Sequence, residues 1–194
     1  MARRSDHTRE ELKNLILSSA SRIIENEGYS ALTVRKIATD IGYTPGTLYN
    51  VFQSMDGLTL ALNAETLERL LTVLAETKAK HENDEAMTTM KAMTRAYSDF
   101  ASQNRERWLM LFMQTASDDT QAPDWFRDKI AELFQPLENA LAPYYETADA
   151  QARKLAARSL WASIHGIYFL KETGKLPLLD DQDVAEDMTD TLIE

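Results

Sequence analysis

Two short helices joined by a tight turn are predicted by LTVRKIATDIGYTPGTLYNVF, residues Leu32–Phe52 of the 194-residue chain. In its first half, apolar residues recur at helical spacing behind Thr33, which stands in the N-cap position: Val34, Ile37, Ala38 and Ile41. Gly42 follows the last of them, where a residue without Cβ adopts the left-handed turn at least cost. Thr44 and Pro45 then offer a second N-cap followed by proline at the first helical position.

The second helix needs to turn only Leu48 and Phe52 inward, because these two apolar residues are spaced for one helical face. Small and polar residues are left for its outer face: Pro45, Gly46, Thr47, Tyr49 and Asn50. A helix, a short turn with glycine and a second helix of this kind form the helix-turn-helix pattern of DNA-binding proteins. Small side chains let the backbone approach base edges, and tyrosine and threonine hydroxyls can bind phosphates. The spacing alone also fits an ordinary corner inside an all-helical protein.

The residues from Leu32 to Leu58 resemble the tetracycline-repressor (TetR/AcrR) family of one-component bacterial regulators. The shared residues are Leu32-Thr33-Val34-Arg35-Lys36-Ile37-Ala38, Gly42-Tyr43-Thr44-Pro45-Gly46-Thr47-Leu48-Tyr49, Phe52 and a preceding Glu27-Gly28-Tyr29 link. The resemblance implies a helix-turn-helix DNA-binding domain over residues 1–53 and a helical effector-binding and dimerisation domain over residues 54–194. We expect DNA contacts from one set of residues in the first domain: Thr33, Arg35, Tyr43, Thr44, Pro45, Gly46, Thr47, Tyr49 and Asn50.

The formal net charge of −10 is distributed unevenly between these domains. Residues 1–56 contain seven Lys or Arg and seven Asp or Glu, whereas residues 57–194 contain 14 and 24. Acidic bulk repels phosphate, so we expect weak and strongly salt-dependent non-specific DNA binding. No Lys or Arg occurs from Ile37 to Asn63, and Met55 stands where the family usually has a lysine. Base readout through hydrogen bonds and methyl contacts is therefore expected, with Arg35 as the exception.

Helical spacing continues along the rest of the chain, and no stretch shows the alternation of a strand. Beside the helix-turn-helix it predicts helices at about 8–27, 54–80, 87–104, 108–113, 124–141, 147–173 and from 180 onwards. Thr8 and Glu11 are in register for a capping box, and Ser54 can cap the long helix that follows the helix-turn-helix. The expected fold class is all-α, with about nine helices.

Hydrophobic residues make up 44% of the chain and charged residues 27%, which is ordinary for a globular protein. No apolar run approaches the roughly 18 residues of a membrane-spanning helix, and the first residues lack the apolar core of a signal peptide. We therefore expect a cytoplasmic protein without membrane association. There are no cysteines, and His7, His81 and His165 are scattered along the chain. Because no nucleophile–base set or carboxylate pair stands out, no metal, no cofactor and no enzymatic activity are expected.

Trp161-Ala162-Ser163-Ile164-His165-Gly166 resembles a Trp-…-His-Gly signature in the C-terminal domain of one TetR subgroup. Methionine and aromatic side chains suit adaptable pockets for apolar ligands, although most of them belong to the core. The hypothesis is one effector pocket per subunit, lined by a subset of Met93, Tyr97, Phe100, Trp108, Phe112, Phe126, Trp161 and His165. His165 can equally be a core histidine bonded to a neighbour. Glycine costs about 1 kcal/mol in mid-helix, so Gly166 suggests close approach of another helix or of a ligand.

In the family, the last two helices pack against their copies, which places two recognition helices about one DNA turn apart. The leading hypothesis is a homodimeric, ligand-responsive repressor that binds a palindromic operator in double-stranded DNA. A small hydrophobic effector would tilt the helix over residues 54–80 and move the DNA-binding domains out of register. Two alternatives stay open: a family member that acts through protein contacts without binding DNA, and an all-α enzyme.

Overall fold

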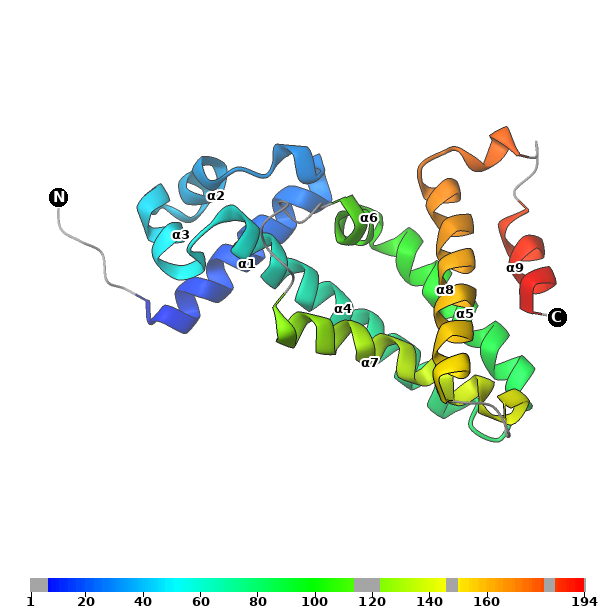
Figure 1. The fold of residues 1–194 in the computed structure, drawn as a ribbon. Helices are drawn as coiled ribbons and strands as arrows, with labels where there is room; N and C mark the ends of the chain where they lie inside the picture. The colour runs from blue at the N-terminus through cyan, green and yellow to red at the C-terminus, as the bar shows by residue number, and fades with distance from the viewer. Residues whose placement is uncertain (1–6, 114–122, 146–149, 180–183, 194) are drawn as a thin grey trace. The chain divides into compact units, whose positions relative to one another are not determined.

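The computed structural model describes residues 7–113, 123–145, 150–179 and 184–193. These ranges contain helices and no strand (Figure 1). The α-helices are α1 (Arg9–Glu27), α2 (Val34–Ile41), α3 (Pro45–Phe52), α4 (Met55–Lys80), α5 (Ala86–Gln103), α6 (Arg105–Met113), α7 (Asp124–Leu141), α8 (Ala150–Glu172) and α9 (Ala185–Ile193). Short 3-10 helices are η1 (Tyr29–Ala31), η2 (Ala142–Tyr145) and η3 (Leu176–Leu178). The predicted all-α fold is confirmed, and no described helix has the length and apolar character to cross a bilayer.

The chain divides into two compact units. The N-terminal unit comprises residues 1–66 and 106–114, and the C-terminal unit comprises residues 67–105 and 115–194. Helix α4 begins in the first unit and continues into the second, whereas nearly all of α6 belongs to the first. Compactness does not test which residues bind DNA or an effector. The functional division between residues 1–53 and 54–194 therefore stays a prediction.

The N-terminal unit is built on α1, which begins at a complete capping box. The backbone N–H of Glu11 donates to Thr8 Oγ1 (3.2 Å), and the backbone N–H of Thr8 donates to Glu11 Oε2 (2.7 Å). The buried stripe of α1 joins residues of the other N-terminal helices in one core: Ile16, Leu17, Ala20, Ile23, Ile24, Leu32, Ile37, Ala38, Leu48, Leu58, Leu62 and Met110. Because α2 and α3 each bury one face in this core, their opposite faces are turned outward.

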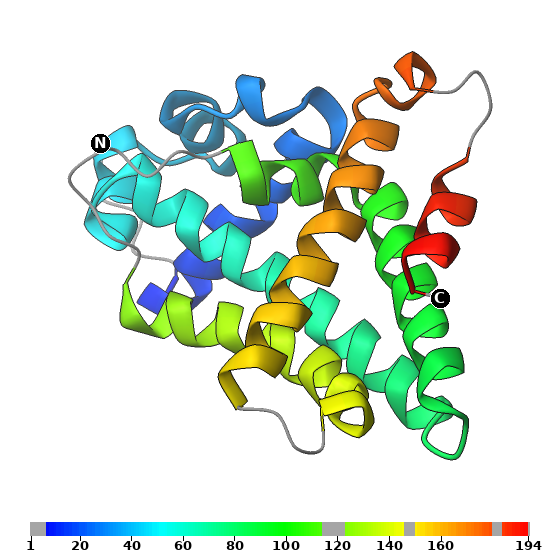
Figure 2. The same cartoon turned by 45° about the vertical axis from the view of Figure 1, so that its right-hand side comes forward.

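The C-terminal unit is formed by α5, α7, α8, α9 and the rest of α4. Helix α7 packs on α8, and α9 lies against α5 and α8, as both ribbon views show (Figures 1 and 2). Gly174 follows the end of α8: its φ is 69°, and the backbone N–H of Lys175 donates to the carbonyl of Leu170 (2.7 Å). The predicted start of the last helix, at Asp180, lies outside the described residues.

Candidate nucleic-acid interface and ligand cavity

The outer face of α3 is the exposed part of the predicted helix-turn-helix. Leu48 is 2% exposed and anchors the helix in the core, while Phe52 is half-buried. Four of the residues predicted to contact DNA are exposed on the other side: Pro45, Gly46, Tyr49 and Asn50. Tyr49 is 49% exposed, so a large part of its side chain is on the surface. The helix therefore presents a small, uncharged surface with one aromatic hydroxyl.

The start of α3 differs from the prediction in one detail. Thr44 occupies the N-cap position and Pro45 the first helical position, as expected. The Thr44 hydroxyl, however, accepts no backbone N–H and instead lies 3.1 Å from Thr47 Oγ1. The two hydroxyls thus form a pair, and Thr47 is half-buried rather than fully free on the surface. A base or phosphate that bonds to either hydroxyl would therefore bond to a group that already has the other hydroxyl as a hydrogen-bonding neighbour.

The turn between α2 and α3 follows the predicted geometry. The backbone N–H of Lys36 donates to Thr33 Oγ1 (3.2 Å), so Thr33 caps α2. Gly42 is left-handed, with φ 73° and ψ 28°. Tyr43, just after the turn, has its hydroxyl 2.7 Å from Nδ1 of His7, which precedes α1. Reasoning from the sequence missed His7 because a single histidine before a helix carries no local signal of this contact.

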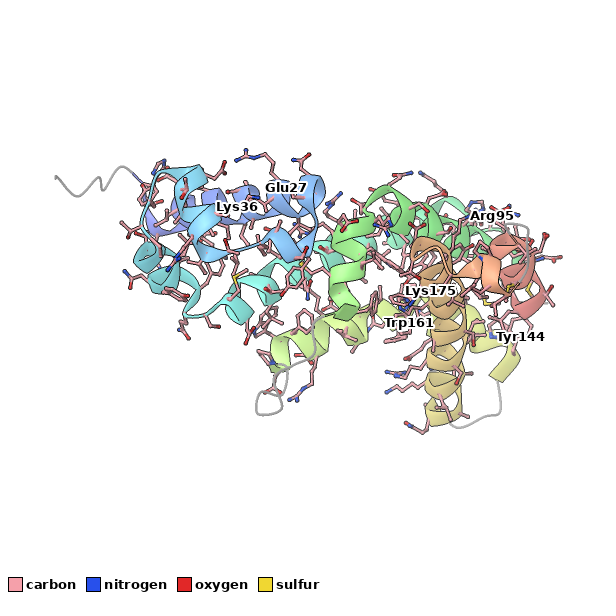
Figure 3. The ribbon with its side chains drawn as sticks, turned by 90° about the horizontal axis from the view of Figure 1, so that it is seen from above. Glu27, Lys36, Arg95, Tyr144, Trp161 and Lys175 are labelled. Atoms are coloured by element: carbon pink, nitrogen blue, oxygen red, sulfur yellow. The ribbon has the colours of Figure 1, made fainter. Side chains whose placement is uncertain are left out.

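Most cations of α1 and α2 are paired with carboxylates inside the N-terminal unit. Arg22 and the hydroxyl of Ser19 both donate to Asp40, and Lys36 pairs with Glu27 (Figure 3). The Ser19 hydrogen bond, followed by Arg22, lowers the pKa of Asp40 below its ordinary 3.8. Pairing reduces the positive field that Arg22 and Lys36 offer to a phosphate.

Two of the residues predicted to contact DNA border one surface hollow beside these pairs. Thr33 and Arg35 are both exposed there, next to Lys36 and Arg22. Arg35 therefore brings a guanidinium to the N-terminal turn of α2, where backbone N–H groups also favour an anion. Glu27 and Asp40 also line the hollow, where they pair with Lys36 and Arg22.

A separate, apolar cavity of about 50 Å³ lies inside the C-terminal unit. Helices α4, α5, α7 and α8 line it with Leu74, Met90, Met93, Thr94, Tyr97, Leu133, Phe134, Leu137, Trp161 and Ile164. Three of the predicted pocket residues, Met93, Tyr97 and Trp161, are among them. The other lining residues were not predicted to line a pocket, because the helical spacing that turns a side chain inward is the same for a core residue and for a pocket residue.

The other predicted pocket residues do not line this cavity. Three of them belong to the C-terminal unit: Phe100, Phe126 and His165. His165 contacts two residues that line the cavity, Tyr97 and Trp161. Trp108 and Phe112 are on α6 in the N-terminal unit, where their rings contact one another at 5.4 Å between centroids. Trp108 has no exposed surface. Phe112, by contrast, is 37% exposed.

His165 is hydrogen-bonded to the cavity wall. Its Nδ1 lies 2.8 Å from the hydroxyl of Tyr97, which links α8 to α5. The imidazole stacks on Trp161 with 5.0 Å between ring centroids and an interplanar angle of 11°. Burial lowers the pKa of His165 from 6.5 to about 4, so the imidazole is neutral at neutral pH. His165 is therefore bonded to a neighbour, as one of the two alternatives expects, and its contact with a ligand stays a prediction.

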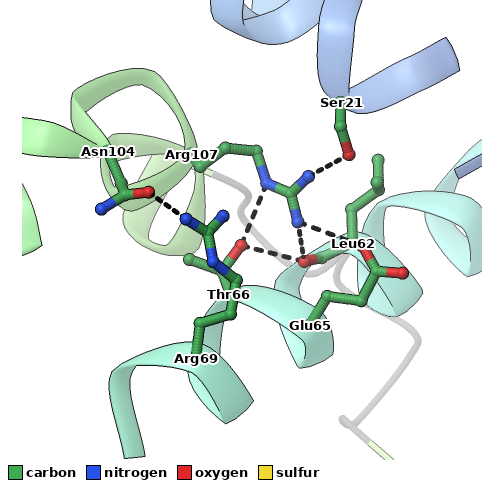
Figure 4. Close-up of polar contacts among 7 residues, drawn as sticks. All are labelled: Ser21, Leu62, Glu65, Thr66, Arg69, Asn104 and Arg107. Atoms are coloured by element: carbon green, nitrogen blue, oxygen red, sulfur yellow. Dashed lines mark hydrogen bonds and ion pairs between the residues drawn. The ribbon is translucent and has the colours of Figure 1, made fainter. Parts of the chain in front are cut away.

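A buried arginine ties α6 to the rest of the N-terminal unit. Arg107 is 2% exposed; its Nε donates to Thr66 Oγ1 (3.0 Å) and its Nη2 to the carbonyl of Leu62 (2.6 Å) (Figure 4). Its Nη1 donates to the hydroxyl of Ser21 on α1, and Glu65 lies 3.5 Å away. One guanidinium therefore holds α1, α4 and α6 together. The sequence showed no sign of it, because the apolar pattern of α6 does not reveal a partner for an inward arginine.

The fold and the exposed outer face of α3 define a helix-turn-helix DNA-binding protein with a second helical unit. Residues 16–62 match the family model for bacterial regulatory proteins of the tetR family. Residues 90–193 match the model for the tetracyclin repressor-like C-terminal domain. The chain therefore belongs to the TetR family of transcriptional regulators, whose members bind DNA and small-molecule effectors and act as dimers.

Individual relatives agree with this assignment. An uncharacterised HTH-type transcriptional regulator of Mycobacterium tuberculosis is 26% identical over 174 residues, which cover 89% of this chain and 76% of the relative. A protein of unknown function from Rhodococcus sp. RHA1 has a TM-score of 0.74 at 20% identity, covering 99% of this chain and 97% of that one. FadR of Thermus thermophilus, a TetR family repressor in complex with lauroyl-CoA, has a TM-score of 0.66 at 17% identity, covering 93% and 91%. The multidrug binding protein EbrR, complexed with malachite green, has a TM-score of 0.59 at 19% identity, covering 94% and 96%. At these identities the solved structures establish a shared fold.

Proposed function

We propose that the protein is a cytoplasmic repressor without enzymatic activity, which binds a palindromic operator as a homodimer and is released by a small hydrophobic effector. The outer face of α3 is the observation that supports this proposal most directly. Its exposed glycine and proline admit close approach of the backbone to base edges, and the hydroxyl of Tyr49 is available to a phosphate. Thr33 and Arg35 on α2 add a cap and a cation to the same helix-turn-helix.

The effector would occupy the cavity of the C-terminal unit. Two proteins that share the fold are complexed with small molecules, one with lauroyl-CoA and one with malachite green. Leu74 of α4 lines the cavity, and the same helix begins in the N-terminal unit. A ligand that displaces Leu74 therefore acts on a helix continuous with the DNA-binding unit. Binding would shift the population toward a spacing of the two DNA-binding units that does not fit consecutive grooves.

Dimerisation would use α8 and α9. One face of α8 is exposed and carries apolar and small residues: Leu155, Ser159, Ala162 and Ser163. On α9, Met188 is 36% and Leu192 is 41% exposed. In the described chain, a Cβ built at Gly166 would have no heavy atom within 4 Å, so the close neighbour expected from the sequence is not supplied by this chain. A second copy packed on this face would supply it and would explain the glycine.

The decisive experiment is selection of bound DNA from a genomic fragment pool by the purified protein, at low and at physiological salt. We expect recovery of a palindrome whose half-sites are about one helical turn apart. Recovery of a single half-site would contradict the dimeric repressor. Recovery of no specific DNA at either salt concentration would favour the alternative, a family member that acts through protein contacts. That alternative has some support in the pairing of Arg22 with Asp40 and of Lys36 with Glu27.

A further inference from the structure

The wall of the cavity in the C-terminal unit is uncharged. Among the ten described residues that line it, none carries an ionisable acid, lysine or arginine. The polar side-chain groups of these residues are the hydroxyls of Thr94 and Tyr97 and the indole N–H of Trp161. The Thr94 hydroxyl donates to the carbonyl of Met90 (3.0 Å), which leaves its oxygen as an acceptor. A ligand here would therefore meet hydrocarbon, aromatic faces and a few hydroxyl groups.

One charged side chain beside the wall is paired with an opposite charge. The guanidinium of Arg158 lies over the ring of Phe134, a residue of the wall, 4.8 Å from the ring centroid. The same guanidinium donates to Glu138 Oε1 (3.0 Å), and the Glu138 side chain is only 13% exposed. Because Glu138 and Arg158 offset one another's charge, a ligand carboxylate gains less from Arg158, and a ligand cation less from Glu138, than either would gain from an unpaired ion. Transfer of an ion from water into a cavity with such a wall is strongly unfavourable when no counter-charge is available.

The hydrogen bond between Tyr97 and His165 gives the wall one adaptable polar position. When His165 Nδ1 accepts, the phenol O–H is used in that bond, so a ligand can only donate to the Tyr97 oxygen. In the other tautomer Nδ1–H donates to the Tyr97 oxygen, and the phenol O–H can be given to a ligand. The two tautomers suit a ligand oxygen of either kind, a hydroxyl or a carbonyl. Because the imidazole is neutral at neutral pH, it supplies no charge for an anion.

From these observations we infer that the cavity takes an uncharged, mainly apolar molecule with one hydrogen-bonding oxygen, placed at Tyr97, and that it rejects carboxylates and organic cations. This inference rests on the proposed function, in which the cavity is the effector site. The inferred ligand differs in charge from the ligands of two structural neighbours, because lauroyl-CoA and malachite green are both charged molecules.

The size of the cavity adds a condition. At about 50 Å³ it is smaller than the engineered 150 Å³ cavity that accommodates benzene in another protein. Any ligand larger than a few atoms must therefore displace side chains of the wall. Met90 and Met93 are the residues best suited to move, since methionine has three rotatable bonds and no branch. Leu74 would move with them if the ligand extends toward α4.

The test compares probes of matched size that differ in charge, added to the full-length protein at neutral pH. The one-ring set is benzyl alcohol, toluene, benzoate and benzylammonium; the chain set is 1-octanol, octanoate and octylammonium. Affinity is measured by isothermal titration calorimetry and by the rise in melting temperature. In each set we expect the alcohol to bind at least about tenfold more tightly than either ion, because the ion loses its hydration without gaining a counter-charge. Toluene should bind less tightly than benzyl alcohol.

Two tyrosine variants test the position of the oxygen. Tyr97→Phe should lower the affinity for benzyl alcohol about fivefold, to that of toluene, because one hydrogen bond is lost. Tyr168→Phe is the matched control, since Tyr168 is also buried but does not line the cavity, and it should leave both affinities unchanged. Urea unfolding of both variants establishes that they are folded.

Equal binding of an ion and the alcohol would overturn the uncharged-ligand inference and leave the effector site in place. An equal effect of the two tyrosine variants would overturn the role of Tyr97. Binding of no probe in either set would overturn the inference altogether. The selection of operator DNA does not involve the cavity, so it would still report separately on the proposed function.

Discussion

Two glycines, Gly42 just before α3 and Gly46 inside it, adopt different backbone conformations. Gly42 has φ 73° with nothing within 4 Å of a built Cβ, so Gly42→Ala adds only backbone strain. We expect it to lower the free energy of unfolding by about 1–2 kcal/mol. Gly46 lies in α3 without a positive φ, and a Cβ there meets Thr44 Oγ1 at an ordinary 3.8 Å. Urea unfolding should show Gly46→Ala to be as stable as the wild type, while operator binding is weakened by the added methyl group. Strong destabilisation by Gly46→Ala would contradict this assignment.

Tyr49 and Thr47 are expected to contribute differently to DNA recognition. Tyr49→Phe removes a hydroxyl that is exposed and placed for a phosphate, so affinity should fall about fivefold on every DNA sequence. Thr47→Ala breaks the pair with Thr44 Oγ1 and should change which base is preferred at one position of the half-site. Binding to an operator library with single-base changes measures both effects. If both variants weaken all sequences equally, the two roles are assigned incorrectly.

The partly buried imidazole of His165 makes stability depend on pH. Its pKa is about 4 in the folded protein and close to its ordinary 6.5 when the chain unfolds, so the unfolded state binds the proton first. Stability from the neutral imidazole is complete above pH 6.5 and decreases as the pH falls from 6.5 toward 4. Urea midpoints at about pH 7.5 and about pH 5 should differ less for His165→Gln than for the wild type. Asp40 does not interfere, because its pKa is lowered from 3.8. Equal pH dependence of the two proteins would count against a partly buried, neutral His165.

At the scale of elements, Arg107 is the residue that holds α6 against α1 and α4. Arg107→Met keeps most of the volume but leaves the hydroxyls of Ser21 and Thr66 without their donor. We expect the free energy of unfolding to fall by about 2–3 kcal/mol, since hydrogen bonds to a buried charge are lost. Arg69→Met is the control, because Arg69 is exposed and donates only to Asn104 (2.6 Å) among the bonds drawn (Figure 4). Chemical unfolding of the two variants should separate them clearly, and equal losses would argue against an anchoring role of Arg107.

At the scale of the whole molecule, the proposed function requires two copies. Leu155→Glu and Leu192→Glu place a charge on the exposed faces of α8 and α9, which are 63% and 41% exposed at these positions. Because both sites are already accessible in the single chain, the variants should fold but sediment as monomers and lose operator affinity. Trp125→Glu, at a 49% exposed site on α7, should stay dimeric. A wild-type protein that sediments as a monomer at micromolar concentration would exclude the proposed assembly.

Much of the helix-turn-helix could be predicted because its determinants are local. Thr8 and Thr33 cap their helices, Gly42 takes the left-handed turn and Pro45 begins α3, each through sterics or hydrogen bonds within four residues of the chain. The same local pattern placed Leu48 inside. Helix type, helix ends and the outward face of α3 therefore follow from the order of the amino acids.

The contacts between distant residues could not be predicted in this way. His7 meets Tyr43 across 36 positions, Tyr97 meets His165 across 68, and Arg107 reaches Ser21 across 86. The cavity is likewise closed by four helices, and the predicted Trp108 belongs to a different unit. Helical periodicity says which face of a helix is apolar, but not which other helix covers it or whether the packing leaves a gap. Those outcomes depend on crossing angles and side-chain volumes summed over the whole fold, so they appear only when the tertiary structure is assembled.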